Sequence, residues 1–228
     1  MKRLKSLALA AVLLATGTAG AADISIDTAA GRKTVATPVA TVAVFDIAAI
    51  DTLDKLGIRP AGLPSNLYLK ELSRLSDGAT VVGDIFEPDL EALSALAPDL
   101  IILGGRSSTK VDATAKVAPT IDMTMDGDDL IDQARARIAT YGRLFGKETE
   151  AEAARKELDG AIETARAAVA GKGKALIVMT NGPKVSTYGP GSRFGWVHAA
   201  LDLPPAIAEI ETATHGEAVA FAFIREAN

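Results

Sequence analysis

A long helical run near the middle of the chain constrains the fold most. Residues 147–170 are rich in Ala, Glu, Lys and Arg, and apolar residues recur in this run at spacings of three and four. At about 1.5 Å per residue the helix would be roughly 35 Å long, which is enough to join two separate lobes. We therefore expect one lobe over residues 22–146 and another over residues 171–228.

The segment before this run has the alternation of strands and helices that is typical of parallel α/β structure. A strand opens the segment 40–50, and further short strands are expected at 58–62, 80–83 and 100–103; helices are expected at 51–56, 88–97 and 128–145. Leu100 to Leu103 is apolar at every position, as in a strand covered on both faces. This order predicts a parallel sheet.

The segment after the long run predicts a second, smaller α/β lobe. A strand is expected at 175–180, a helix at 196–201, and a last helix beginning near Ala218. Only about 58 residues follow the long helix, which is about half of what the first lobe uses. The predicted fold is therefore α/β, with two Rossmann-like lobes joined by one long helix and with the second lobe incomplete.

The first 21 residues have the features of a cleavable signal peptide. Lys2, Arg3 and Lys5 precede a short apolar run at 7–14, and Ala19-Gly20-Ala21 supplies the small residues that precede a cleavage site. The apolar run is too short to span a bilayer. A buried N-terminal helix is the alternative.

The absence of Cys limits both the kinds of site that the chain can form and the cellular compartment in which we expect the protein. A chain without Cys has no disulfide, no thiolate metal site and no lipid-attachment Cys of the kind that an exported lipoprotein needs. Together with the predicted signal peptide, this indicates a periplasmic protein that is not a lipoprotein.

The net charge bears on the type of ligand. The chain carries −5, and the predicted signal peptide holds three basic and no acidic residues, so the remainder carries −8. An acidic protein is a poor candidate for nucleic-acid binding. An anionic ligand would need a local basic site that acts against the overall field.

Two glycine-rich loops are candidates for such a site. Gly104-Gly105-Arg106 follows a predicted strand, and Gly189–Gly195, which contains Arg193, precedes a predicted helix. Ligands of open parallel sheets bind beyond the carboxyl ends of the strands, so Arg106 and Arg193 would face a cleft from opposite lobes and suit a multiply charged anion. The alternative is that both are solvated surface residues. Neither loop has the pattern of a nucleotide-binding motif.

Four other side chains are candidates for a role near the ligand. His215 could ligate Fe(III) or bind a ligand oxygen, or it could simply cap a helix; His198 is interpreted as structural. Tyr188 could contact the ligand or pack in the core, and Trp196 could line the cleft or wedge its helix. No catalytic nucleophile–base set and no zinc-ligand spacing is recognisable, so an enzyme is not expected.

Several segments match a known family. Val44-Phe45-Asp46, Phe86-Glu87-Pro88-Asp89, Pro98-Asp99-Leu100-Ile101-Ile102 and Gly104-Gly105-Arg106 resemble siderophore-binding proteins of ABC importers. Gly189-Pro190-Gly191-Ser192-Arg193-Phe194-Gly195 and Thr214-His215-Gly216 are similar to the catecholate or petrobactin-type branch of that family.

The resemblance implies a class III periplasmic solute-binding protein, which binds a ferric siderophore between its lobes. A ferric tris-catecholate is a trianion, and Arg106 and Arg193 match two of the Arg residues with which the family holds it. His215 matches a His that completes iron coordination in some relatives. A third Arg and a Tyr partner of that His would both fall beyond Asn228.

The resemblance also implies partners. Glu91 matches the acidic residue with which the first lobe docks on an inner-membrane ABC permease, whereas the second-lobe position falls near Ala222, where relatives tend to carry Glu. A monomer without a permanently bound cofactor is expected. The alternatives are the same fold binding haem, cobalamin or ferric citrate, a truncated product that does not bind, and a periplasmic enzyme that uses His215 as a base.

Overall fold

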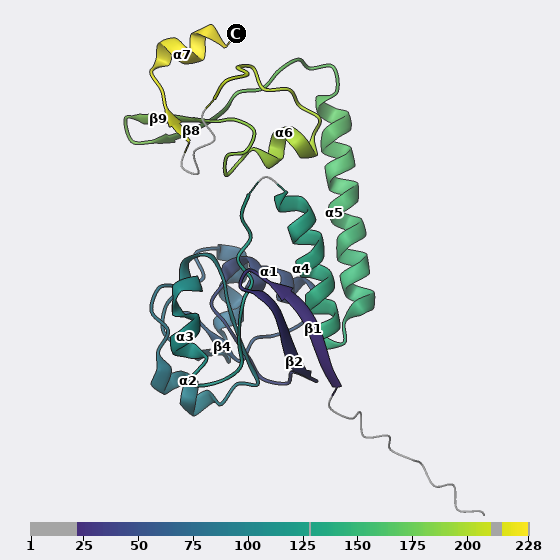
Figure 1. The fold of residues 1–228 in the computed structure, drawn as a ribbon, viewed down its shortest axis with the longest axis vertical. Coiled ribbons are helices and arrows are strands. Elements are labelled where there is room, and N and C mark those ends of the chain that lie inside the picture. Colours follow the sequence, from purple (N-terminus) through teal and green to yellow (C-terminus); the bar gives the residue numbers. More distant parts are fainter. Residues whose placement is uncertain (1–21, 128, 211–215, 228) are drawn as a thin grey trace, which may run out of the picture.

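The computed structural model describes residues 22–127, 129–210 and 216–227. Two lobes of unequal size lie along one long helix, α5 (Glu148–Val169) (Figure 1). The predicted signal peptide, residues 1–21, lies outside the described residues. Within the described ranges, no helix has both the length and the apolar character that a membrane crossing requires.

A five-stranded parallel sheet forms the centre of the first lobe. Its strand order is β5-β4-β3-β6-β7, and every neighbouring pair is parallel, which confirms the predicted arrangement. The strands are β3 (Val42–Val44), β4 (Gly62–Leu63), β5 (Thr80–Val81), β6 (Leu100–Leu103) and β7 (Thr120–Asp122).

Helices cover both faces of this sheet, because alternate residues of each strand point to opposite sides. Val44 and Ile102 belong to a buried cluster that includes side chains of α1 and α4, whereas Ile101 and Leu103 belong to a second cluster with Leu93 of α2. The helices of this lobe are α1 (Ile47–Lys55), α2 (Leu90–Leu96), α3 (Val111–Thr114) and α4 (Leu130–Phe145), with 3₁₀ helices η1 (Lys70–Ser76) and η2 (Gly105–Lys110).

The start of α1 differs from the prediction. Helix α1 begins at Ile47 rather than at Asp51, because the Asp46 carboxylate accepts a hydrogen bond from the Ala48 amide at 3.2 Å and caps the helix there. The strand predicted at the beginning of this segment is therefore confined to Val42–Val44.

An antiparallel hairpin, which the sequence analysis did not anticipate, precedes the parallel sheet. It consists of β1 (Ala22–Thr28) and β2 (Gly31–Thr37). Ile26 and Val35 are buried in the cluster that contains α1. The alternation of Ile24 and Ile26 with polar residues was the available signal for this strand.

The sheet in the described part of the second lobe is antiparallel, which differs from the expected Rossmann-like unit. Its sheet has the order β10-β9-β8, from β8 (Ile177–Asn181), β9 (Lys184–Tyr188) and β10 (Glu217–Ala218), and it is accompanied by α6 (Trp196–Ala200) and α7 (Phe221–Glu226). A two-residue turn at Gly182 and Pro183, with a φ of 57° at Gly182, reverses the chain directly after β8. Such a turn joins antiparallel strands and leaves no room for a crossover helix.

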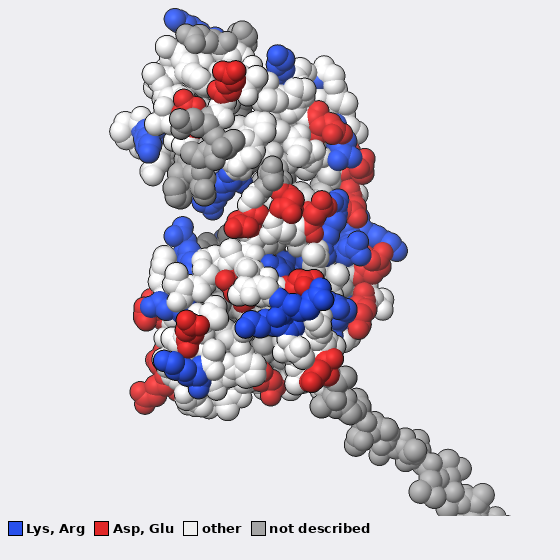
Figure 2. All heavy atoms as spheres, viewed as in Figure 1, with Lys and Arg blue, Asp and Glu red and all other residues white. Residues whose placement is uncertain are grey.

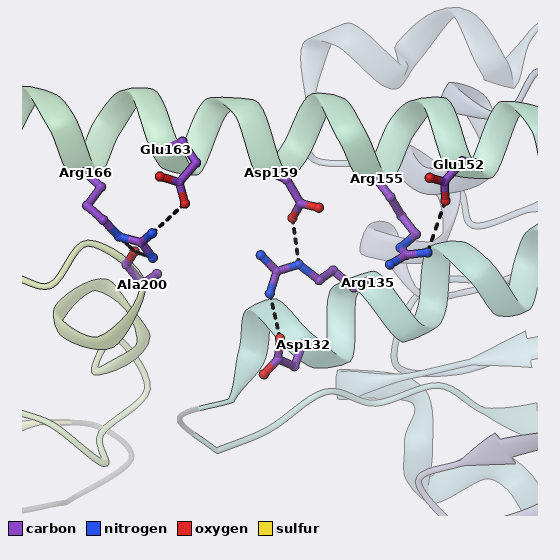
Figure 3. A network of polar contacts seen from close by, with 8 residues as sticks. All are labelled: Asp132, Arg135, Glu152, Arg155, Asp159, Glu163, Arg166 and Ala200. Carbon is purple, nitrogen blue, oxygen red and sulfur yellow. Dashed lines mark hydrogen bonds and ion pairs between the residues drawn. The ribbon is translucent and has the colours of Figure 1, made fainter.

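Polar contacts connect α5 to a helix of each lobe (Figure 3). On the first lobe, Arg135 of α4 donates to Asp159 of α5 at 2.7 Å and to Asp132 at 2.6 Å. On the second lobe, Arg166 of α5 donates to the carbonyl oxygen of Ala200, the last residue of α6, at 2.8 Å. These contacts are partly exposed, so each contributes about 1 kcal/mol or less, but together they restrict how the helices pack.

Candidate ligand-binding cleft

A cleft of about 600 Å³ lies between the lobes. The space-filling view shows the molecule hollowed between its two lobes, with basic side chains on the facing edges of both (Figure 2). The cleft is lined by Phe45, Asp46, Ile47, Tyr68, Ile85, Phe86, Gly104, Gly105, Arg106 and Arg193. Its volume is within the usual range for small-molecule sites. Most of the lining follows the carboxyl ends of parallel strands, where ligands of such sheets bind.

Arg106 belongs to the first-lobe wall. It lies in η2, directly after the buried strand β6, and its guanidinium lies over the Phe86 ring, 5.5 Å from the ring centroid. The turn below it is fixed because the buried Ser107 hydroxyl bonds both the amide and the carbonyl oxygen of Gly104, each at 3.1 Å. Arg106 itself is exposed and can reach a ligand in the cleft.

Arg193 comes from the second lobe and completes the cleft. Its loop is closed by the Ser192 hydroxyl, which donates to the carbonyl oxygen of Gly189 at 2.6 Å. The Arg193 guanidinium lies 5.5 Å from the centroid of the Phe194 ring. The structure therefore brings Arg106 and Arg193 to one cleft from different lobes, each supported by an aromatic ring.

Asp46 places a carboxyl group in the cleft that also contains the two guanidinium cations. Gly104 lies so close to Asp46 that a Cβ added at Gly104 would be 2.7 Å from the carboxylate Oδ2. Burial is the largest cause of the raised pKa of Asp46, and it is opposed by backbone hydrogen bonds and by the charge of Arg137.

Tyr188 and Trp196, for which both a ligand contact and a packing role were considered, are not among the residues that line this cleft. Tyr188 is only 1% exposed, and its ring packs edge-on against Phe194 at a centroid distance of 4.8 Å. It thus supports the aromatic ring beneath Arg193. Trp196 lines a separate pocket against α4 and α5, with Ile131 and Ile162. The reading of Trp196 as a wedge for its helix fits this position better than a ligand contact.

The two histidines and Glu91 complete the set of predicted residues. His198 is buried, and its Nδ1 lies 2.8 Å from the carbonyl oxygen of Leu203, which accords with the structural interpretation. His215 lies outside the described residues. Glu91 is exposed in the first turn of α2, and its backbone amide donates to the capping carboxylate of Asp89 at 3.0 Å. Across the described ranges, no group of three or more His, Asp or Glu side chains is placed to hold a metal ion.

Sequence reasoning did not single out Tyr68 and Phe86 as cleft residues. Phe86 belongs to the segment Phe86-Glu87-Pro88-Asp89, so its motif was recognised but not its position in the cleft. Tyr68 lies in an irregular segment before η1, where no periodic pattern gives a signal. Both are strongly exposed aromatics, at 59% for Tyr68 and 49% for Phe86.

Known proteins resemble this chain over most of its length. The petrobactin-binding protein YclQ of Bacillus subtilis (strain 168) is 35% identical over 191 residues, which are 82% of this chain and 60% of that protein. The ferric-anguibactin-binding protein FatB of Vibrio anguillarum is 29% identical over 194 residues, with the same shares covered. The chain thus spans about 60% of the length of these curated relatives.

Solved structures agree with this likeness. The crystal structure of YclQ matches with a TM-score of 0.84 at 31% identity, covering 90% of this chain and 74% of that one. The catecholate-siderophore-binding protein VctP of Vibrio cholerae matches with a TM-score of 0.80 at 28% identity, covering 91% and 76%. A family model described as periplasmic binding protein matches residues 42–228. The chain therefore belongs to the periplasmic binding protein family.

Proposed function

We propose that this protein is the solute-binding component of an ABC importer and that it binds a ferric siderophore, of the catecholate type, in the cleft between its lobes. The observation that carries the proposal is the convergence of Arg106 and Arg193, from different lobes, on one cleft. Guanidinium groups stay charged at all physiological pH values and donate several hydrogen bonds to ligand oxygens. A trianionic ferric chelate would supply negatively charged oxygens to the guanidinium groups of both Arg106 and Arg193.

The relatives support this class of ligand. YclQ is named for petrobactin and VctP for catecholate siderophores. We propose accordingly that the iron arrives and leaves as part of its chelate, with His215 as a further ligand of the metal. The protein would need no permanently bound cofactor and would not act as an enzyme.

The site of action follows from the same proposal. A monomeric protein exported by the predicted signal peptide would work in the periplasm and hand its ligand to an inner-membrane permease. Glu91, exposed on α2, is the residue that we propose for docking of the first lobe.

Isothermal titration calorimetry tests ligand binding directly. Ferric enterobactin, a tris-catecholate, should bind the wild-type protein, and Arg106→Ala and Arg193→Ala should each weaken it. Loss of one charge-assisted hydrogen bond costs about 1.5–3 kcal/mol, which corresponds to a roughly 10- to 150-fold higher Kd. Arg32→Ala is the matched control. Arg32 is a surface residue of β2 that pairs with Asp27, and its substitution removes the same charge as the two cleft substitutions.

Two results would contradict the proposal. The first is an absence of heat with ferric enterobactin and with ferric petrobactin. The second is a Kd that changes equally in Arg193→Ala and Arg32→Ala, which would indicate only a net-charge effect. A thermal-shift panel with haem, cobalamin and ferric citrate would then identify the alternative ligand class.

A further inference from the structure

Tyr68 has a backbone conformation that a bulky residue rarely adopts. Its φ is 61°, in the left-handed region. Among the described residues other than glycine, only Ala97 and Asp202 share a positive φ. This conformation brings the side chain of an L-residue against its own backbone, so it persists only where surrounding contacts impose it.

Local contacts impose the conformation at Tyr68. The Leu69 amide donates to the carbonyl oxygen of Leu67 at 2.8 Å, which closes a three-residue turn with Tyr68 at its centre. The Tyr68 amide donates to the side-chain oxygen of Asn66, also at 2.8 Å. Leu67, 4% exposed, anchors the turn in the core on one side, and Leu72, 1% exposed, on the other. The turn is therefore fixed at both ends and extends Tyr68 outward.

The outward side chain lies in the cleft. The Tyr68 ring is 59% exposed and lines the cleft together with Phe86 and the two Arg residues. Phe86 is held in a similar way, because the Asp84 carboxylate accepts hydrogen bonds from the amides of Phe86 at 2.7 Å and Glu87 at 2.9 Å. The exposed rings of Tyr68 and Phe86 thus lie in the same cleft as the two guanidinium groups, and local backbone hydrogen bonds fix the position of each ring.

This combination fits a ligand that is both anionic and aromatic. The guanidinium groups would hold the negative oxygens, whereas exposed rings gain free energy when another ring covers them. An aliphatic chelate, such as a citrate complex, would satisfy the cations but would leave the aromatic surface in water.

We propose that Tyr68 is a specificity-determining residue, whose ring packs against an aromatic ring of the ligand, so that the cleft favours aryl over aliphatic ferric chelates. The proposal rests on the proposed function, because it assigns a role within the same cleft. It predicts that the strained backbone serves binding rather than folding.

A pair of glycine substitutions separates these two roles. Tyr68→Gly removes both the strain and the ring, and Ala97→Gly removes the same kind of strain at the end of α2, at a residue that does not line the cleft. Both variants should melt about 2–4 °C higher than the wild type. Only Tyr68→Gly should bind ferric enterobactin more weakly, by about tenfold. Tyr68→Phe keeps the ring and should stay within about threefold of the wild-type Kd.

Calorimetry and thermal melts on the full chain decide the matter. Wild-type protein should bind ferric enterobactin more tightly than ferric citrate. The proposal is overturned by an unchanged Kd in Tyr68→Gly, by equal affinity for the two chelates, or by a Tyr68→Phe variant as weak as Tyr68→Gly. A lower melting temperature in Tyr68→Gly alone would assign the ring to folding and would also overturn it. If the wild-type protein binds neither ferric enterobactin nor ferric petrobactin, the proposed function fails as well, which is a distinguishable result.

Discussion

Gly104 is the position at which a single methyl group should damage the cleft. A Cβ at residue 104 would lie 2.7 Å from Oδ2, 2.9 Å from Cγ and 3.0 Å from Cβ of Asp46. The shortest of these is about 0.7 Å inside the ordinary contact distance of 3.4 Å, so one of the two residues must move. If Asp46 moves, α1 loses its cap, at a cost of about 1 kcal/mol. If the 104 backbone moves, overpacking costs about 1–3 kcal/mol and shifts Arg106.

Gly104→Ala should therefore destabilise the protein by about 1–3 kcal/mol. A loss of this size lowers the melting temperature by roughly 2–12 °C in a chain of this length. Calorimetry should also show weaker binding of ferric enterobactin, because Arg106 follows two residues later. The matched control is Gly160→Ala in α5, where a Cβ would meet nothing within 4 Å.

Gly160→Ala should raise stability by about 0.5–1 kcal/mol, because alanine is the better helix former, and should leave the Kd unchanged. The reasoning about Gly104 would be refuted by a Gly104→Ala variant that melts and binds like the wild type. It would also be refuted if both alanine variants shifted the melting temperature in the same direction.

Two further predictions concern charged groups. Burial raises the pKa of the Asp46 carboxyl above its ordinary value of 3.8, so its contribution to stability is fully present below that pH and is lost as the pH rises through the folded pKa. The free energy of unfolding, measured in urea between about pH 3 and about pH 7, should show this loss in the wild type but not in Asp46→Asn, and parallel pH curves for the two proteins would contradict the prediction. Arg166→Ala should cost about 1 kcal/mol in thermal unfolding, because its contacts with Ala200 and Asp202 are partly exposed; a loss several times larger would mean that these contacts hold the second lobe in place.

The elements with the clearest sequence patterns were predicted almost to the residue. The all-apolar run Leu100–Leu103 is strand β6 as predicted, and the run 147–170 is helix α5, Glu148–Val169. Strand β7 was missed because its three residues form a strand only by pairing with β6. The start of α1 was misplaced because two Asp residues could each cap a helix, and only the structure shows that Asp46 does so.

In the candidate site, too, the positions of some residues follow from local sequence, whereas the positions of others depend on how the chain packs. The rule that ligands bind beyond the carboxyl ends of parallel strands accounts for Arg106 after β6. It does not account for Arg193, which follows the antiparallel strand β9 and was expected at the same cleft mainly from the family resemblance. Nothing in the sequence distinguishes a tyrosine that faces a ligand from one that supports a neighbouring ring, so both roles were left open for Tyr188, which is buried against Phe194. The left-handed backbone of Tyr68 is held by hydrogen bonds to Asn66 and around the turn at Leu67, with Leu67 and Leu72 buried on either side, and no periodic pattern in this segment reveals it.

A crystal structure of the protein with bound ferric enterobactin, with an anomalous difference map at the iron absorption edge, would test the central claim most directly. We predict one iron peak between the guanidinium groups of Arg106 and Arg193, with the catecholate oxygens facing both. An iron peak on another surface, or two guanidinium groups that face separate surfaces with the chelate bound to neither, would contradict the account.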